Sequence, residues 1–358
     1  MIEKELVIIG GGPAGLAAAR LAAEAGVEVL IIDRMKQLGG QLVKQTHKFF
    51  GSKKQYAKFR GIEIAEILSE AALKLKVEVL AEAVVLGIYP DKVLTVLKGE
   101  EYIKIKAQAI IIATGASEKV LAFENNDLPG VYGAGAVQTL MNVHGVRPGS
   151  RMLMVGSGNI GLIVSYQLMQ AGIEVAAVIE ASPQIGGYLV HAAKLRRLGV
   201  PIITSCTIKK ALGSNSVQGA ITVRLDEAWQ EIPGTETTYE VDGICIAVGL
   251  SPLSNLLAMA ECRMKYIGEL GGLVPILDSS YQTSQNGIFA CGDVSGIEEA
   301  SSAMVEGGIA GLSAAHLLGK VHPQYDELLI DYKQQLSNLR SGPGGVKIRK
   351  GLQKMETL

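Results

Sequence analysis

The sequence predicts an α/β fold that contains two copies of one strand–helix–strand unit. Short apolar runs alternate with helical segments rich in alanine and leucine, and a glycine-rich turn joins strand to helix twice. Hydrophobic residues make up 48% of the chain and aromatic residues only 5%, which favours a close-packed α/β protein over an all-β or a disordered one. A chain of 358 residues is long enough for two or three domains with substantial cores.

The first copy begins with an apolar strand at residues 6–9 and a glycine turn at 10–15. A helix then runs to about Glu24, and a second strand at residues 27–32 ends on Asp33. In this pattern glycines allow a tight turn and a close backbone approach to pyrophosphate, the helix N-terminus faces that charge, and the acid binds a ribose. The residues expected to bind a dinucleotide here are Gly10, Gly12, Pro13, Ala14, Gly15 and Asp33.

The second copy repeats the pattern with a strand at residues 152–155, a glycine turn at 156–161, a helix to Gln170 and a strand at 175–179 that ends on Glu180. In both copies a glycine pair follows the acid six and seven residues later. Two complete patterns in one chain are specific evidence for two nucleotide sites. The second set of expected ligands is Gly156, Gly158, Asn159, Ile160, Gly161 and Glu180.

Glu180 also predicts which nicotinamide nucleotide binds. A carboxylate can accept hydrogen bonds from a free ribose 2′-hydroxyl but repels a 2′-phosphate. The three residues after Glu180 are Ala, Ser and Pro, so no arginine is present there to neutralise such a phosphate. NAD(H) is therefore preferred over NADP(H).

The remaining elements are less regular. Helices are expected at 61–75, 136–143 and 302–318, with an amphipathic helix from about 325 and a glycine-rich, basic tail after 341 that forms a mobile terminus or a docking arm. Further strands are expected at 77–80, 84–88, 92–97, 102–107, 109–113, 201–208, 216–225, 237–240 and 243–248. Residues 43–59 are basic and aromatic. Such a loop could bind an anionic substrate or a partner protein, but it is more often an ordinary surface loop.

These motifs together resemble the two-dinucleotide-binding-domain flavoproteins, the pyridine nucleotide–disulfide oxidoreductase superfamily. The resemblance rests on the two glycine turns with their acids, on Thr114-Gly115 after an apolar strand, and on the stretch from Thr283 to Asp293. It implies two Rossmann-like three-layer ββα dinucleotide-binding domains, the second inserted in the first. The FAD domain would comprise 1–115 and 265–320, the NAD(H) domain 116–264, and a C-terminal helix and tail 321–358.

The same resemblance assigns further ligands. Asp293 would hold the ribityl chain of FAD, and the backbone near Ser302 and Ala303 would face the pyrimidine end of the flavin. The other cofactor-binding residues that it implies are Arg34, Gly40, Gln41, Val84, Ala113, Thr114, Gly115, Gly249 and Gly292. A solvated loop amide is an equally good interpretation of Gln41.

In several features this chain differs from other members of that superfamily, and these differences narrow its expected role. The four cysteines (Cys206, Cys245, Cys262, Cys291) form neither the CxxxxC nor the CxxC pair of disulfide reductases, so disulfide reduction, a zinc site and a catalytic thiolate are not expected. No catalytic acid or base is expected either. The segment from Asn126 to Gly149 looks like the FAD/NAD-binding alpha subunits of dye-linked proline, hydroxyproline or opine dehydrogenases, related to sarcosine oxidase. Such a subunit implies a second flavoprotein partner, and any iron–sulfur centre would belong to a separate polypeptide.

Composition excludes other roles. The net charge is −1 with both signs interspersed, so nucleic acid is not an expected partner. No apolar run reaches the length of a membrane span, the N-terminus does not resemble a signal peptide, and a cytoplasmic location is expected.

Three hypotheses about the function remain open. The chain is an NADH-oxidising subunit of a dehydrogenase complex, a stand-alone NADH-dependent reductase of a quinone or another small acceptor, or a non-catalytic nucleotide-binding subunit.

Overall fold

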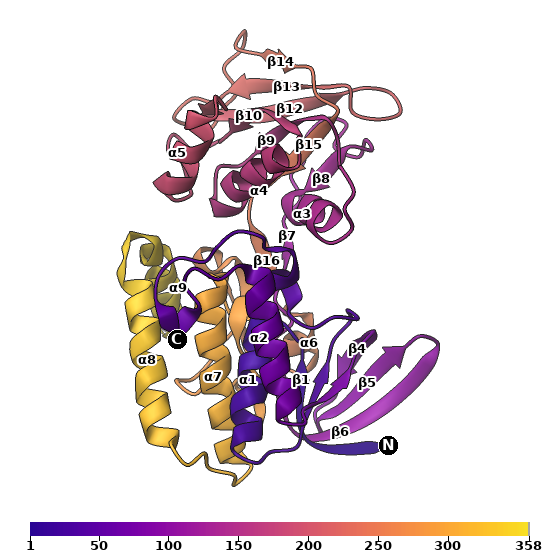
Figure 1. The fold of residues 1–358 in the computed structure, drawn as a ribbon, viewed down its shortest axis with the longest axis vertical. Coiled ribbons are helices and arrows are strands. Elements are labelled where there is room, and N and C mark those ends of the chain that lie inside the picture. Colours follow the sequence, from indigo (N-terminus) through magenta and orange to yellow (C-terminus); the bar gives the residue numbers. More distant parts are fainter. Residues whose placement is uncertain (357–358) are drawn as a thin grey trace. The chain divides into compact units, whose positions relative to one another are not determined.

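The chain forms two compact units in a computed structural model that describes residues 1–356, with the backbone alone described at Pro343 and Glu356 (Figure 1). Unit 1 comprises Met1–Ser117 and Ser251–Leu358, and unit 2 comprises Glu118–Leu250. The chain returns to unit 1 earlier than residue 265, where the sequence placed that boundary. Residues 251–264 belong to unit 1 because Leu257, Ala260 and Cys262 are buried in its core.

The sheet of unit 1 has the strand order β3-β2-β1-β6-β5-β4, and β19 pairs with β6. Strands β1, β2, β3, β6 and β19 run parallel, whereas β4, β5 and β6 form an antiparallel meander. The strands are β1 (Ile2–Ile9), β2 (Val29–Ile32), β3 (Glu78–Leu80), β4 (Ala83–Ile88), β5 (Val93–Lys98), β6 (Glu101–Ile112) and β19 (Ile288–Ala290).

β6 is one strand of 12 residues, and the prediction of two strands at 102–107 and 109–113 is wrong. Its first half pairs antiparallel with β5, from Glu101 to Lys106. Its later residues pair parallel with β1 up to Ile112. Gln108 does not break the strand because its neighbours Ala107 and Ala109 both pair with β1, a constraint that local sequence cannot show.

Alternation along β1 divides the core of unit 1 into two layers. Leu6 and Ile8 face one buried cluster, and Val7 and Ile9 face the other. Helices α1 (Pro13–Glu24), α2 (Gly61–Lys74) and α7 (Ala300–Leu317) contribute to the first cluster. The meander and α6 (Asn255–Met259) contribute to the second. The predicted three-layer arrangement of helices, central sheet and small β meander is confirmed.

Helices α1 and α7 pack unusually closely because α7 presents glycines to α1. An ideal Cβ on Gly307 would lie 2.0 Å from the Ala14 carbonyl oxygen, and one on Gly311 would lie 2.3 Å from that of Ala18. Figure 1 shows α2, α1, α7 and α8 (Tyr325–Ser341) as neighbouring helices. This contact places the beginning of α7 against the first glycine turn.

The C-terminal segment is folded against unit 1, so the expected mobile tail is not found in the described residues. Residues 346–356 form α9 (Val346–Glu356), whose Ile348 and Met355 are buried with Ile267, Leu270 and Val274. The apolar residues lie on one helical face, and their spacing in the sequence could have predicted this helix. Residues 357–358 lie outside the described part of the chain.

Unit 2 contains a parallel sheet of order β11-β10-β9-β15-β8 and an antiparallel sheet of order β12-β13-β14. The predicted strand at 201–208 is split into β11 and β12. The elements are β8 (Val131–Gly133), α3 (Ala134–Asn142), β9 (Arg151–Val155), α4 (Asn159–Gln170), β10 (Glu174–Ile179), α5 (Leu189–Arg197), β11 (Ile202–Ile203), β12 (Cys206–Leu212), β13 (Gly219–Arg224), β14 (Thr237–Tyr239) and β15 (Gly243–Ile246).

Two small sheets and five 3₁₀ turns complete the fold among the described residues. Two small sheets pair β7 (Ala116–Glu118) with β16 (Leu250–Pro252) and β17 (Met264–Ile267) with β18 (Gly272–Pro275). The 3₁₀ turns are η1 (Gly40–Lys44), η2 (Lys53–Gln55), η3 (Gly268–Leu270), η4 (Gly292–Val294) and η5 (Pro343–Gly345).

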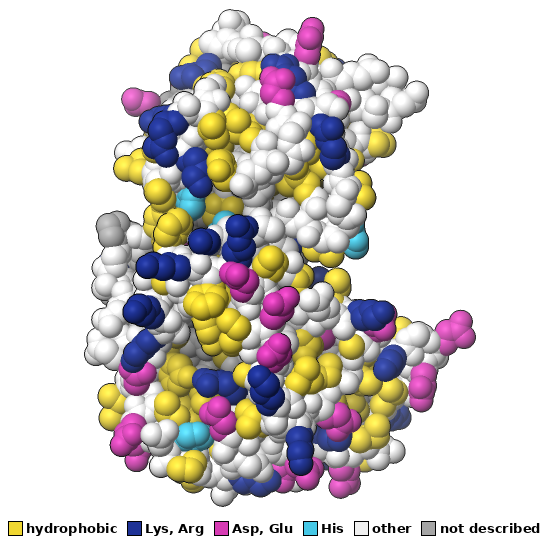
Figure 2. Space-filling model, in the orientation of Figure 1, with side chains coloured by type: hydrophobic (Ala, Val, Ile, Leu, Met, Phe, Trp, Pro, Cys, Tyr) yellow, Lys and Arg dark blue, Asp and Glu magenta, His cyan; other side chains and the backbone are white. Residues whose placement is uncertain are grey.

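In the basic loop at residues 43–59, Lys54 pairs with Asp331 of α8 at 2.6 Å. On the face shown in Figure 2, Lys and Arg are interspersed with Asp and Glu.

Candidate dinucleotide sites

The first glycine turn has the geometry that the sequence predicts. Gly10 has φ +105°, and a Cβ there would lie 2.3 Å from the Ala113 carbonyl oxygen. A Cβ on Gly15 would lie 1.9 Å from the Gly10 carbonyl oxygen, so only glycine lets α1 pack this close to β1. Gly12 begins α1 without a side-chain cap, and the nearest atom to an added Cβ is the Gly40 Cα at 3.8 Å. The first N–H groups of α1 are therefore available to an anion.

Asp33 holds the turn as well as lying where a ribose is expected. The Gly11 N–H donates to Asp33 Oδ2 at 2.6 Å, and the Met35 N–H donates to Oδ1 at 2.7 Å. The residue is 8% exposed, and each carboxylate oxygen retains acceptor capacity for a hydroxyl. The Ala83 N–H donates to the Asp33 carbonyl at 3.0 Å. The next residue, Val84, is 46% exposed, and its contact with a cofactor stays a prediction.

Two of the other residues assigned to the first site, Arg34 and Gln41, are exposed to solvent. Gly40 has φ +55°, and a Cβ there would lie 2.8 Å from the Gly12 Cα, so the backbone at Gly40 packs closely against the turn. The assignment of these three residues to a cofactor stays a prediction.

The second glycine turn repeats the geometry of the first. Gly156 has φ +108°, and a Cβ there would lie 2.3 Å from the Ala247 carbonyl oxygen. A Cβ on Gly161 would lie 2.1 Å from the Gly156 carbonyl oxygen. Gly158 has no atom within 4 Å of an added Cβ. The backbone at this turn is thus open to a pyrophosphate in the same way as at Gly12.

Asn159 and Ile160 follow this turn at the start of α4. Asn159 Oδ1 accepts the Tyr188 N–H at 2.8 Å, so this side chain orders the segment that carries the second glycine pair. Ile160 is 39% exposed. Both residues remain predicted nucleotide contacts.

Glu180 occupies the position in unit 2 that Asp33 occupies in unit 1. Its Oε2 accepts the Ser157 N–H at 2.8 Å and the Ser157 hydroxyl at 2.7 Å, and its Oε1 accepts the Ser182 N–H at 2.9 Å. Both acids therefore bind the second residue of their own glycine turn and the residue two positions after themselves. Sequence reasoning assigned them to ribose alone and missed this role.

The chain passes from unit 1 to unit 2 after Thr114 and Gly115, and it returns after Gly249. Hydrogen bonds link the outgoing segment to the returning one. The Thr114 hydroxyl donates to the Leu253 carbonyl at 2.9 Å, and the Leu253 N–H donates to the Gly115 carbonyl at 2.9 Å. The Lys119 N–H donates to the Gly249 carbonyl at 3.0 Å. Gly115 and Gly249 have φ +73° and +114°, which explains the choice of glycine at both positions.

The loop after β19 brings Gly292 and Asp293 next to α1. Gly292 has φ +76°, and a Cβ there would lie 2.9 Å from the Ala14 Cβ. Burial raises the pKa of Asp293 to about 6, while a hydrogen bond from the Glu298 backbone opposes this shift. Ser302 and Ala303, each 5% exposed, lie in the first turn of α7, which begins at Ala300 rather than at 302.

The raised pKa of Asp293 gives a pH-dependent prediction for the ligand-free chain. A carboxyl whose pKa rises from 3.8 to about 6 on folding binds its proton more tightly in the folded state. The folded state is thus favoured below about pH 4, and this contribution is lost as pH rises through 6. We expect Asp293→Asn to increase the free energy of unfolding by about 1–2 kcal/mol at pH 8 and to change it little at pH 4. Urea unfolding at both pH values measures this, and an equal change at both would contradict it.

A buried charge network supports the Gly292 loop, and sequence reasoning did not predict it. Glu306 of α7, 4% exposed, accepts the Gly292 N–H at 2.8 Å and the Tyr281 hydroxyl at 3.1 Å. Arg340 of α8 pairs with Glu306 at 2.5 Å and with Glu298 at 2.6 Å. Burial, followed by the neighbouring Glu298, raises the pKa of Glu306 to about 7, and Arg340 opposes the shift. In the sequence, a single acid in an otherwise apolar helix was the feature that could have indicated this network.

The four cysteine thiols lie in the interior of the protein. All four cysteines are buried and free, and burial raises the pKa of each thiol. A buried protonated thiol is a poor nucleophile. Within residues 1–356, no three His, Cys, Asp or Glu side chains gather in a way that could hold a metal ion. In the same part of the chain, no helix has the length and apolar character needed to cross a membrane.

Comparison with known proteins agrees with this geometry. A family model described as pyridine nucleotide-disulphide oxidoreductase matches residues 4–307. The alpha chain of sarcosine oxidase from Corynebacterium sp. (strain P-1) is 27% identical over 335 residues, which cover 89% of this chain and 33% of that protein. An opine oxidase subunit from Rhizobium meliloti is 25% identical over 340 residues, which cover 88% of this chain and 63% of that protein.

A solved structure shares the fold over most of the chain. L-proline dehydrogenase from P. horikoshii superimposes with a TM-score of 0.70 at 23% identity and covers 94% of this chain and 59% of that one. The chain spans a third of the length of the sarcosine oxidase relative and less than two thirds of the opine oxidase relative. The family match covers both glycine turns and both acids, and the chain therefore belongs to the pyridine nucleotide-disulphide oxidoreductase family.

Proposed function

We propose that this chain is an FAD-dependent NAD(H) oxidoreductase that serves as one subunit of an amino-acid dehydrogenase complex. When bound, FAD would take hydride from NADH, or deliver it in the reverse direction, and exchange electrons with a partner flavoprotein. The observation that carries this proposal is the repeated glycine turn with an acid at the end of the next strand, found once in each unit.

The residues of unit 1 fit FAD. The first N–H groups of α1 and the open face of Gly12 would bind pyrophosphate, and Asp33 would accept a ribose hydroxyl. Asp293, held in the loop after β19, would bind the sugar-alcohol chain. The buried start of α7 at Ser302 would exclude water from the flavin edge.

The residues of unit 2 fit NAD(H). Gly158 and the first N–H groups of α4 would bind its pyrophosphate, and Glu180 would bind the adenosine ribose. No side chain in either unit needs to act as acid or base, because hydride transfer between the two cofactors needs only their positioning.

Relatives favour a role within a complex over a stand-alone reductase. Two of the similar proteins are subunits by name, of sarcosine oxidase and of opine oxidase. A second flavoprotein is accordingly the proposed partner, and an iron–sulfur centre, if the complex has one, is assigned to another chain.

Anaerobic mixing tests this proposal. The protein purified with its bound cofactors should lose the visible absorbance of its flavin when NADH is added, within one turnover and without any added partner. Native mass spectrometry of the complex purified from its host should then show a second flavoprotein. A flavin that NADH cannot reduce would favour the non-catalytic hypothesis, and reduction in a chain that purifies alone would favour the stand-alone reductase.

Glu180 variants test the nucleotide preference. Glu180→Ala removes the negative charge and should weaken the use of NADH and relax the rejection of NADPH, by about tenfold in the ratio of the two kcat/KM values. Glu180→Gln should also relax it while keeping an acceptor for the Ser157 or Ser182 N–H. Ser157→Ala is the matched control because it loses a hydrogen bond to Glu180 but no charge. Unchanged selectivity in both Glu180 variants would show that this acid does not select the nucleotide.

A further inference from the structure

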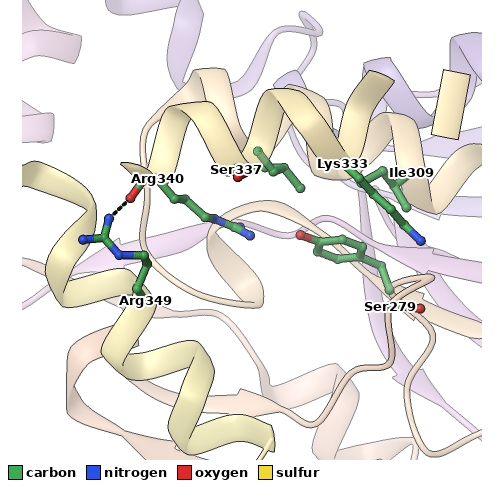
Figure 3. Close-up of a pocket in the computed structure, with 8 residues that line it drawn as sticks. Ser279, Ile309, Lys333, Ser337, Arg340 and Arg349 are labelled. Carbon is green, nitrogen blue, oxygen red and sulfur yellow. Dashed lines mark hydrogen bonds between the residues drawn. The ribbon is translucent and has the colours of Figure 1, made fainter. Parts of the chain in front are cut away.

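One arginine side chain connects α8 to the segment between β19 and α7. Arg340 of α8 donates from Nη2 to Glu306 Oε1 at 2.5 Å and to Glu298 Oε1 at 2.6 Å. Its Nε donates to the same Glu298 oxygen at 3.0 Å. Glu298 lies just before α7, and Glu306 lies within it. Figure 3 shows Arg340 on α8, where Arg349 of α9 donates to its carbonyl oxygen, so α9 also holds the backbone of this residue.

The Glu306 carboxylate extends this contact to the backbone of Gly292. Its Oε1 accepts hydrogen bonds from the Arg340 guanidinium and from the Tyr281 hydroxyl, the latter at 3.1 Å. Its Oε2 accepts the Gly292 N–H at 2.8 Å. One buried carboxylate therefore binds α8 through one oxygen and the loop after β19 through the other. Since charge-assisted hydrogen bonds are short and strong, the position of Gly292 depends on that of Glu306.

Asp293 lies between these two anchored points. Its Oδ1 accepts the Glu298 N–H at 3.4 Å, and the Glu298 side chain is itself bound by Arg340. On the other side, Gly292 lies so close to α1 that an ideal Cβ would be 2.9 Å from the Ala14 Cβ. A shift of residues 292–298 would therefore move the Asp293 carboxylate and change the contact with the first turn of α1.

We propose that Arg340 is a positioning residue of the FAD site, because its two carboxylate partners hold the loop that carries Asp293. The inference rests on the proposed function, since Asp293 and the first turn of α1 are parts of unit 1 that are assigned to FAD. Loss of Arg340 should then weaken FAD binding by a folded chain, as an effect separate from any loss of global stability.

The charge of Glu306 makes this role dependent on pH. Among the described residues, the charged and titratable groups that face Glu306 are Arg340 of α8, Glu298 before α7, Tyr281 before β19 and Cys291 after β19. Burial, followed by Glu298, raises the pKa of Glu306 to about 7, and Arg340, the one cation in this set, opposes the shift. Without Arg340 the pKa rises further, and above it FAD binding, which requires the closed loop, must bury an uncompensated charge. The FAD affinity of such a variant should fall as pH rises.

Titration of the flavin-free full chain with FAD at pH 6 and pH 9 tests the proposal, with flavin fluorescence as the readout. Relative to the wild type at the same pH, Arg340→Met should raise the FAD Kd at least about tenfold at pH 9 and less than about threefold at pH 6. In the Arg340→Met background, Glu306→Gln should remove most of this pH dependence, because the amide cannot ionise. A role in global stability alone would not alter the Kd of the folded chain in this way.

Further variants provide the controls. Lys54→Met removes the exposed cation that pairs with Asp331 of α8 and should leave the FAD Kd unchanged at both pH values. Circular dichroism shows whether each variant is folded. If Arg340→Met is unfolded at pH 9, a pair of changes at Glu306 tests the same connection. Glu306→Ala removes the acceptor of the Gly292 N–H and should raise the FAD Kd at least about tenfold, whereas Glu306→Gln keeps an acceptor and should stay within about threefold of the wild type.

Three results would overturn the assignment. They are wild-type affinity in folded Arg340→Met at pH 9, a loss of affinity that is equal at both pH values, and a Glu306→Ala chain that binds FAD as tightly as Glu306→Gln. A wild-type chain that binds no FAD would instead contradict the proposed function, and this role with it. The two failures are distinguishable because the first leaves wild-type FAD binding intact.

Discussion

Replacement of Arg340 by methionine is expected to lower the free energy of unfolding of unit 1 by about 3–5 kcal/mol at pH 8. The methionine keeps much of the volume but leaves Glu298 and Glu306 buried without a cation. Two uncompensated buried carboxylates are costly, and the Glu306 carboxylate also holds the Gly292 N–H. Urea unfolding followed by circular dichroism measures the loss.

The size of this loss should depend on pH. Burial already raises the pKa of Glu306 to about 7, and removing Arg340 takes away the cation that opposes the shift. The folded variant can bind a proton at Glu306 more tightly than the unfolded chain does, so its loss of stability should become smaller as pH falls from 8 to 5. A deficit that is the same at both pH values would contradict the electrostatic explanation.

Two further variants isolate the buried pair. Lys54→Met removes an ion pair to the same helix, but its partners Lys54 and Asp331 are 58% and 43% exposed, and the expected loss is below about 1 kcal/mol. In the Arg340→Met background, Glu306→Gln should restore part of the stability because it removes one buried charge. If Arg340→Met costs no more than Lys54→Met, the network does not stabilise the loop.

The parts of the site that are local in sequence could be predicted from it. Each glycine turn is specified within six residues, because the φ of Gly10 and Gly156 and the close packing at Gly15 and Gly161 tolerate no side chain. The acids could be located by their distance from the turn. That they first bind their own turn could not be inferred, because a ribose contact and a backbone contact require the same residue type in the same place.

The parts that depend on distant contacts could not be predicted. The return to unit 1 near residue 251 is set by Leu257 and Cys262, whose core partners lie far away in the sequence. The pairing of Arg340 with Glu306 joins residues 34 apart on two helices. The spacing of apolar and polar residues in the sequence indicated an amphipathic helix from residue 325. It did not indicate which polar residue of that helix is buried.

Replacement of Gly307 by alanine tests the close contact on which the geometry of the first site depends. In an ordinary helix this change stabilises the fold by about 1 kcal/mol, because alanine has the higher helix propensity. Here the new Cβ would lie 2.0 Å from the Ala14 carbonyl oxygen, so α7 must move away from α1. We expect a net loss of about 2–3 kcal/mol in the free energy of unfolding. We also expect weaker retention of the proposed FAD, since Ala14 and Gly292 lie close together at the glycine turn.

Gly268 provides the matched control for this prediction. Its Cβ would meet no atom within 4 Å, and its φ is not positive, so Gly268→Ala should be neutral or slightly stabilising. Unfolding in urea and flavin content after gel filtration measure both effects for the two variants. Destabilisation without flavin loss in Gly307→Ala would separate the helix packing from the cofactor site. A Gly307→Ala protein as stable as the wild type would show that α7 and α1 can move apart at little cost, and the placement of the Gly292 loop against α1 would then need another explanation.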